Sequence, residues 1–163
     1  METLVAVIMS SRSDWKTIQP ANKTLASLGI SHEVRIISPR KKPEKLRQYA
    51  ESAAKRGIKL IIACEGDSVN ISDDLISATS LPVLGVIGQP KETGAADSSF
   101  SSGNRSAATP VCALSHGEVG AKNAALLAAN MLAEIYPSLR KSTSRYLRQA
   151  DAASSSPGPS TAI

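Results

Sequence analysis

The chain has 163 residues, about the length of one domain and enough to bury a hydrophobic core. It is 42% hydrophobic and 20% charged, as expected of a globular protein, but only 3% aromatic, which argues against a nucleic-acid binder that stacks bases on aromatic rings. Nineteen Lys and Arg against 14 Asp and Glu leave a net charge of +5, an excess that favours small anionic ligands as readily as nucleic acid.

Cysteine content and hydropathy favour a cytoplasmic protein. Cys64 and Cys112 cannot build a disulfide scaffold or a structural zinc site, and both lie in apolar runs, which predicts buried side chains rather than reactive thiols. The opening residues, METLVAVIMS, lack the basic start and longer apolar segment of a secretory signal. No apolar run approaches the ~18 residues needed to cross a bilayer, so we expect no membrane contact.

Five short apolar runs, rich in β-branched residues, predict strands. They cover residues 4–9, 33–37, 58–64, 82–87 and 111–114. Runs such as LIIAC and VLGVI do not alternate apolar with polar residues, so both faces of the sheet should be covered.

Helical patterns separate these strands. The predicted helices cover residues 13–29, 43–57, 72–79 and 118–136. Ser13 is expected to cap the first helix, and Pro20 should kink it or cost about 3 kcal/mol. Pro43 suits a first helical position and Gly57 a helix end. The last helix has Ala and Leu almost all round, which favours burial, including burial against another subunit.

Strands that alternate with helices predict a single α/β domain with a parallel sheet and helices on both faces. This domain should cover residues 1–136, followed by a basic helical extension over 137–150 and a disordered tail over 151–163. Ligands of such sheets bind beyond the carboxyl ends of the strands. That rule selects residues 10–14, 38–43, 64–71 and 88–109.

Two of these segments carry groups that can bind a small anion. The run SSRSD places Ser11 and Asp14 at a helix start, where backbone N–H groups can hold a phosphate or carboxylate; ordinary helix capping is the alternative. The run SPRKKP places three cations after a strand. It is either a solvated basic turn or an anion clamp that uses Arg40 and Lys41.

Acid–base candidates come from the third segment and from one histidine. In CEGDSVN, Glu65 and Asp67 flank Gly66; acids in a loop are most often solvated, but at a crevice mouth they can transfer protons. His116 follows the fifth strand, so a catalytic role is open, whereas His32 lies at a strand beginning and is expected to be structural. No segment has the spacing of a metal site.

Four motifs occur in an order shared with one enzyme family. SSRSDW is similar to its G-S-x-S-D-W, and HEVRIIS followed by PRKKP to its H-E-V-R-V-V-S-A-H-R-T-P; LPVLGV matches outright, and GAKNAALLAA is close to its G-A-x-N-A-A-L-L-A-A. On these motifs the chain resembles the PurE-type carboxyaminoimidazole ribonucleotide mutase family of purine biosynthesis, over about residues 3–133.

The resemblance implies a three-layer α/β/α sandwich with a parallel, flavodoxin-like sheet. It also implies a homo-octamer with active sites at subunit interfaces and no metal or organic cofactor. The family moves a carboxylate from an exocyclic nitrogen to a ring carbon of an aminoimidazole ribonucleotide. Carbon dioxide is released and recaptured in the pocket, and a histidine moves the proton; related members carboxylate the ring directly.

By position, the resemblance gives substrate contacts to Ser11, Asp14 and Ser38. Lys41 occupies the place of the family's phosphate-binding arginine. The lysine keeps the positive charge but cannot form the bidentate hydrogen bonds of a guanidinium group.

Departures from the family gather where its chemistry is done. Arg40 replaces the catalytic histidine, and Asn70 replaces a second histidine in a loop, normally G-A-G-G-A-A-H-L-P-G, that reads CEGDSVNISD here. Three more residues of this loop are expected to contact the substrate: Gly66, Asp67 and Ser68. An arginine with a pKa above about 12 cannot shuttle protons near neutrality, and neither can asparagine.

The leading hypothesis is therefore an enzyme of this fold turned to a non-purine small molecule, in a specialised pathway. Arg40 and Lys41 would bind an anionic substrate, and Glu65, Asp67 or His116 would move a proton in a decarboxylation, isomerisation or cyclisation. The first alternative is a retained mutase or carboxylase of purine biosynthesis, and the second is a non-catalytic scaffold.

Overall fold

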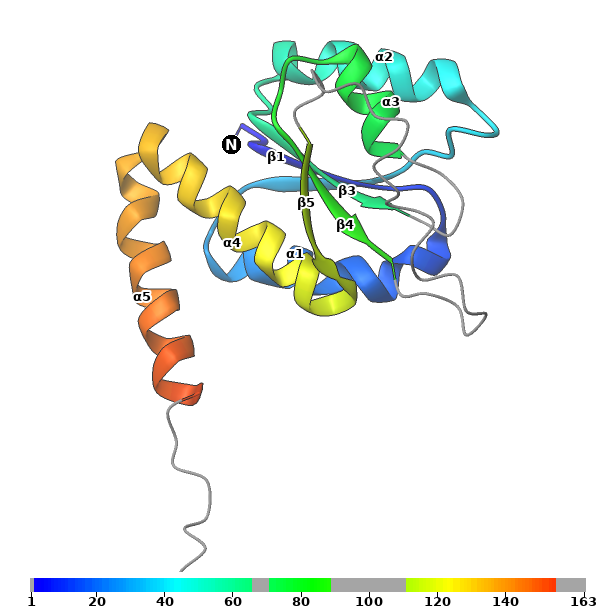
Figure 1. The fold of residues 1–163 in the computed structure, drawn as a ribbon. Coiled ribbons are helices and arrows are strands. Elements are labelled where there is room, and N and C mark those ends of the chain that lie inside the picture. The colour runs from blue at the N-terminus through cyan, green and yellow to red at the C-terminus, as the bar shows by residue number, and fades with distance from the viewer. Residues whose placement is uncertain (1, 66–70, 89–110, 155–163) are drawn as a thin grey trace, which may run out of the picture.

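Helices cover both faces of one five-stranded parallel sheet (Figure 1). The computed structural model describes residues 2–65, 71–88 and 111–154, with the backbone alone for 111–115 and 151–154. The strands are β1 (Val5–Met9), β2 (His32–Ile36), β3 (Leu60–Glu65), β4 (Val83–Ile87) and β5 (Val111–His116). The helices are α1 (Trp15–Ser27), α2 (Pro43–Ala53), α3 (Ile71–Ala78), α4 (Gly117–Ile135) and α5 (Pro137–Ser154), with 3-10 turns at Arg12–Asp14 and Ala54–Arg56.

The strand order is β2-β1-β3-β4-β5, and every neighbouring pair is parallel. This confirms the predicted α/β fold with a flavodoxin-like sheet. Because all strands run the same way, their last residues form one edge of the sheet, here the carboxyl edge, and their first residues form the amino edge. The order reverses between β1 and β3, and in such sheets ligands bind at this point of the carboxyl edge.

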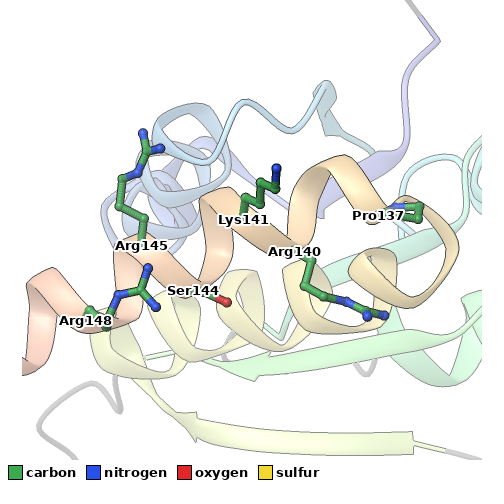
Figure 2. A pocket seen from close by; sticks show the side chains of 6 residues that line it. All are labelled: Pro137, Arg140, Lys141, Ser144, Arg145 and Arg148. Atoms are coloured by element: carbon green, nitrogen blue, oxygen red, sulfur yellow. The ribbon is translucent and has the colours of Figure 1, made fainter.

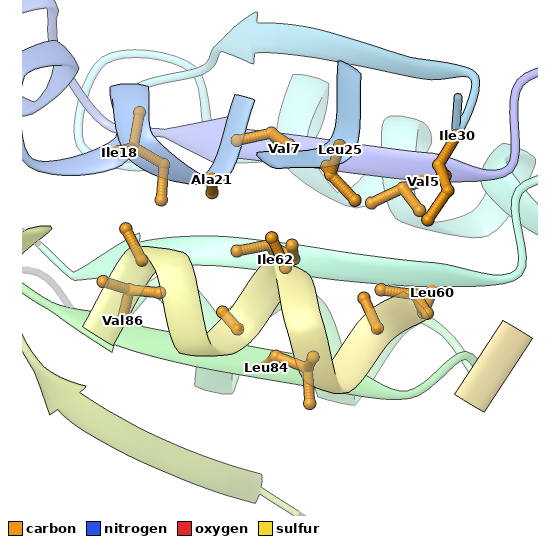
Figure 3. Close-up of a cluster of buried hydrophobic side chains, with 14 of the residues drawn as sticks. Val5, Val7, Ile18, Ala21, Leu25, Ile30, Leu60, Ile62, Leu84 and Val86 are labelled. Atoms are coloured by element: carbon orange, nitrogen blue, oxygen red, sulfur yellow. The ribbon is translucent and has the colours of Figure 1, made fainter. Parts of the chain in front are cut away.

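Alternating side chains of the strands build a core on each face of the sheet, which confirms that both faces are covered. In β1, Val5 and Val7 belong to the cluster under α1 and α4, and Ala6 and Ile8 to the cluster under α2 and α3. Figure 3 shows the first cluster, in which strand side chains face those of α1 such as Leu25. Full burial of these apolar side chains keeps the strand ends at the carboxyl edge in fixed positions.

The first helix begins differently from the prediction. Ser11, rather than Ser13, holds the extended position before the 3-10 turn, with φ −149° and ψ 168°, and its N–H donates to Asp14 Oδ2 at 3.0 Å. The helix α1 then runs on through Pro20, although proline removes the N–H that would bond to the carbonyl of Lys16. Packing of the apolar face of α1 against the sheet maintains the helix.

The later helices agree with the prediction in their ends but not in all of their burial. Pro43 begins α2, and Gly57 follows the 3-10 turn with φ +93°, a left-handed conformation that favours glycine. Within one chain α4 is buried on one side only, because Val119 and Ile135 are 66% and 60% exposed, and its expected burial against another subunit stays a prediction. Only the alanine-rich side of α4 faces the core.

The C-terminal extension is a helix of 18 residues, α5, which contains the whole of residues 137–150 and runs on to Ser154, through the first four residues of the expected tail. Residues 155–163, most of the expected tail, lie outside the described residues. Over the ranges that the structure describes, none of the helices has the length and apolar character required to cross a bilayer.

Candidate active site

The turn after β1 holds the carboxylate of Asp14 in one orientation. Its Oδ2 accepts hydrogen bonds from Ser10 Oγ at 2.9 Å, from the N–H of Ser11 at 3.0 Å and, more weakly, from Ser11 Oγ at 3.4 Å. Ser11 Oγ is in turn hydrogen-bonded to Ser13 Oγ. Asp14 remains partly exposed. A carboxylate that is oriented in this way can accept a hydrogen bond from an amino or hydroxyl group of a ligand.

The chain that leaves β2 forms a turn with exposed cations. The N–H of Lys42 donates to the carbonyl of Ser38 at 2.9 Å, and the N–H of Lys41 to Ser38 Oγ at 3.4 Å, so Ser38 closes the turn. The side chains of Arg40 and Lys41 are exposed. Because β2 is the neighbour of β1, about 4.8 Å away, this basic turn leaves the sheet beside the turn that carries Asp14.

The strand β3 ends on the other side of β1, with Cys64 and Glu65. Cys64 is fully buried, and this burial, followed by the nearby carboxylates of Asp14 and Glu65, raises the pKa of its thiol to about 12. The thiol therefore stays protonated near neutral pH, and Cys64 is the small buried side chain that the sequence predicts. The strands β1 and β3 are neighbours with Met9 opposite Cys64, so the turn that carries Asp14 and the end of β3 at Glu65 leave adjacent positions of the carboxyl edge.

Glu65 lies inside the protein rather than at the mouth of the crevice. It is 4% exposed, and its Oε1 accepts a hydrogen bond at 3.1 Å from the N–H of Ser72 in the first turn of α3. The N–H of Gly88 donates to the carbonyl of Glu65 at 2.9 Å, and a Cβ on Gly88 would lie 2.8 Å from that oxygen. Glu65 thus ties the end of β4 and the start of α3 to β3; a proton-transfer role for it stays a prediction.

The two histidines of the chain lie at opposite edges of the sheet. His32 begins β2, with Nδ1 2.7 Å from the carbonyl of Ile30 and Nε2 2.9 Å from Asn22 Oδ1, which confirms its structural role. His116 ends β5 at the carboxyl edge, and its side chain is exposed. Four strand spacings, about 19 Å, separate β5 from β2, so one chain does not bring His116 to the basic turn.

The structure therefore brings together some of the predicted site residues. Those at the neighbouring exits of β1 and β2 are Ser11, Asp14, Ser38, Arg40 and Lys41. Gly66, Asp67, Ser68 and Asn70, and residues 89–109 of the long loop, lie outside the described residues.

Sequence reasoning missed two contributors. The hydroxyl of Ser10 orients Asp14, and the run S-S-x-S-D was the signal, since a serine four residues before an acid can reach it across one turn. Gly88 permits the close approach of two strand ends, for which the sequence carries no signal.

The arrangement suits a small ligand that carries both an anionic group and hydrogen-bond donors. The exposed cations of the basic turn can hold a phosphate or carboxylate, and the oriented Asp14 carboxylate can accept from an amino or hydroxyl group nearby. Within the described ranges, no cluster of three or more His, Cys, Asp and Glu side chains could hold a metal ion.

Comparisons with known proteins point to one family. The family model of AIR carboxylase matches residues 4–153. The chain is 39% identical to the N5-carboxyaminoimidazole ribonucleotide mutase of Pseudomonas aeruginosa over 90% of both chains, and 40% identical to that of Escherichia coli over 79% of this chain and 76% of the relative. It is also 40% identical to the bifunctional purine synthesis protein purC/E of Dictyostelium discoideum, in an alignment that covers 96% of this chain and 16% of that protein.

Among solved structures, the crystal structure of Treponema denticola PurE has a similar fold. The TM-score is 0.78, with 23% sequence identity over 91% of this chain and 92% of that chain. At 23% identity this similarity is evidence for the fold alone.

These relatives overturn the leading hypothesis of a non-purine reaction. That hypothesis inferred a new reaction from a few loop positions, above all Arg40 and Asn70, while the likeness extends over most of the chain. Relatives at about 40% identity are named for purine synthesis, which favours the retained reaction. The assignment of Arg40 and Asn70 to the family's histidine positions rests on the motifs and stays a prediction.

Proposed function

Because the chain belongs to the AIR carboxylase family, we propose that it catalyses the mutase reaction of purine biosynthesis. In this reaction a carboxylate moves from the exocyclic nitrogen of an aminoimidazole ribonucleotide to a ring carbon. The observation that carries the proposal is the likeness to the mutase of Pseudomonas aeruginosa, which spans nearly the full length of both proteins.

The reaction is an isomerisation in which every atom is kept. The bond between the exocyclic nitrogen and the carboxyl carbon breaks, which releases carbon dioxide and leaves an amine. A new bond then forms between the ring carbon and the same carbon dioxide, and the proton of that ring carbon must leave. Over the whole reaction one proton passes from the ring carbon to the nitrogen, so the site needs an anion clamp, a partner for the amine and a proton carrier.

Residues at the exits of β1 and β2 can supply the first two of these. Asp14, held by Ser10 and Ser11, can accept a hydrogen bond from the exocyclic amine. Arg40 and Lys41 are exposed in the basic turn and can hold the phosphate of the ribonucleotide or the migrating carboxylate. Ser38 supports them by closing that turn.

The proton carrier is harder to place, because arginine does not titrate near neutrality. His116 is the one histidine of the chain at the carboxyl edge, since His32 lies at the amino edge. We assign the proton transfer to His116, with Glu65 and Asp67 as alternatives. Because His116 lies about 19 Å from the basic turn of its own chain, it would serve the site of a neighbouring copy. The proposed assembly is a homo-octamer with sites at subunit interfaces.

The test is turnover by the purified protein. Incubation with N5-carboxyaminoimidazole ribonucleotide should yield the carbon-carboxylated isomer, whereas a carboxylase would need aminoimidazole ribonucleotide with bicarbonate. In cells, the chain should restore growth without purines to a bacterial strain that lacks its own mutase. A folded protein that binds the ribonucleotide but turns over neither substrate would refute the proposal and support the non-catalytic scaffold. Light scattering tests the octamer, and cell fractionation tests the expected cytoplasmic location.

A further inference from the structure

A groove on α5 gathers basic side chains at a distance from the candidate active site. Its volume is about 460 Å³. The residues that line it are Pro137, Arg140, Lys141, Ser144, Arg145 and Arg148 (Figure 2). We call it the α5 groove. The helix α4 runs back from the carboxyl edge, so α5 begins near the amino edge, on the opposite side from the basic turn (Figure 1).

Helical spacing places the four cations on one side of α5. Arg140 and Arg148 stand four residues on either side of Ser144, and Lys141 and Arg145 form the adjacent row, so the cations span about 12 Å along the helix axis (Figure 2). Arg140 has a long ion pair of 3.4 Å with Glu134, and both of its members are exposed. Among the described residues, Lys141, Arg145 and Arg148 make no ion pair.

These cations are not needed to hold α5 in place. The opposite side of the helix does that: Leu139 and Tyr146 pack against the core cluster under α1 and α4, and Thr143 is 3% exposed. With one side packed and the other carrying four like charges, the α5 groove concentrates positive potential over a short length of surface. Mutual repulsion of the cations disfavours this arrangement unless an anion neutralises it.

We propose that the α5 groove binds the polyphosphate chain of a small molecule. Arginine guanidinium groups form bidentate hydrogen bonds with phosphate oxygens, and three guanidinium groups, one ammonium and one hydroxyl can engage adjacent phosphates together. A single phosphate is too small to reach cations spread along about two turns of helix. The residues that line the groove include no aromatic ring to stack on a base. A nucleoside triphosphate and inorganic tripolyphosphate should therefore bind equally well.

Two macromolecular partners fit the groove less well. An amphipathic helix enters a lipid surface through an apolar face beside its cations, but the apolar side of α5 is packed against its own core. Double-stranded nucleic acid gains affinity from many phosphate contacts over a long footprint, whereas the cations of the groove cover about 12 Å.

Isothermal titration calorimetry of the full chain with inorganic tripolyphosphate tests the proposal. The wild type should show saturable binding in the micromolar range, and ATP should bind within about threefold of tripolyphosphate, while inorganic phosphate binds at least about tenfold more weakly. The variant R145Q/R148Q should lose at least about tenfold in affinity. The variant R145K/R148K should lose less, because it keeps the positive charges but not the bidentate guanidinium groups.

The matched control is K23Q/K55Q, which also removes two positive charges, but from exposed positions outside α5. It should leave the affinity unchanged, and so should R40Q/K41Q, which removes charge from the candidate active site. An equal loss of tripolyphosphate affinity in K23Q/K55Q would show that only the net charge matters, and it would overturn the proposal. A loss of affinity confined to R40Q/K41Q would place the binding site in the basic turn and would overturn the proposal as well. Absence of saturable tripolyphosphate binding, or displacement of tripolyphosphate by a short DNA duplex at lower concentration, would overturn it as well. None of these outcomes depends on mutase activity.

Discussion

Polar groups at the two edges of the same sheet are used in different ways. At the amino edge, both ring nitrogens of His32 are bonded within the protein, and Glu33 accepts hydrogen bonds from Tyr49, Arg35 and Arg56. At the carboxyl edge, Asp14 is held through one oxygen, and Arg40, Lys41 and His116 are exposed. Groups whose bonds are satisfied internally contribute to stability, whereas groups that are oriented and exposed can bind a ligand.

The largest expected effect is on turnover, at the carboxyl edge. Asp14→Asn should lower kcat/KM of the proposed mutase at least about a hundredfold, or ~2.7 kcal/mol, because the amide is a weaker acceptor for the amine and carries no charge. The free energy of unfolding should change by less than ~1 kcal/mol, since the amide oxygen can still accept from Ser10 and Ser11. The matched control, Glu33→Gln at the amino edge, should lower the melting temperature and leave kcat/KM within about twofold. Equal losses of activity in the two variants would show that the carboxyl edge does not differ from the amino edge in its role in turnover.

A comparison of two glycines gives the next largest effect. Gly88→Ala should lower the free energy of unfolding by about 2 kcal/mol and reduce turnover, because the new Cβ would lie 2.8 Å from the carbonyl oxygen of Glu65 and push apart two strand ends at the carboxyl edge. Gly29→Ala is the control: it has open space around it and φ +70°, so it should cost about 1 kcal/mol of backbone strain without loss of turnover. Urea denaturation and kinetic assays measure both variants. A Gly88→Ala protein with parental turnover would show that this contact does not position the site.

Replacement of the arginine in the basic turn tests where the proton moves. If residue 40 stands at the family's histidine position, Arg40→His should raise the turnover number about tenfold and add a second titration at about pH 6.5, because an imidazole titrates where a guanidinium does not. The KM for the ribonucleotide should rise, because one cation of the proposed anion clamp is lost. Arg47→His on α2 is the control, since Arg47 is 68% exposed and pairs with Glu51 within that helix rather than belonging to the basic turn. No gain in Arg40→His, at any pH between about 5.5 and 8, would contradict the assignment of residue 40 to the histidine position of the family.

The fold could be read from the sequence because its signals are local and repeated. Unbroken apolar runs such as LIIAC predicted a sheet covered on both faces, and Pro43 and Gly57 marked the ends of one helical segment. The location of the site at the carboxyl ends of the strands could be predicted, but the contacts between its residues could not. Whether Glu65 faces a crevice or the first turn of α3 depends on packing, and the approach of Gly88 to Glu65 joins segments that are distant in the chain. Periodicity carries neither kind of information.

The smallest effect concerns the pH dependence of stability at the amino edge. Burial alone would raise the pKa of Glu33, but hydrogen bonds from Tyr49, Arg56 and Arg35 outweigh it and lower the pKa to about 2. Because this pKa is below the ordinary value of 4.5, Glu33 contributes stability above about pH 4.5 and loses it as the pH falls towards 2.

Such a shift would correspond to about 3 kcal/mol for a fully buried group. Arg35 and Arg56 are 55% and 38% exposed, so solvent screening reduces the expected contribution to about 1 kcal/mol. Urea denaturation at pH 6 and pH 2.5 should therefore show a loss of stability that is about 1 kcal/mol larger in the wild type than in Glu33→Gln. Glu51→Gln, which breaks the exposed pair with Arg47, should retain the wild-type difference. If Glu33→Gln also retained it, the bonds around Glu33 would not be the ones that stabilise the amino edge.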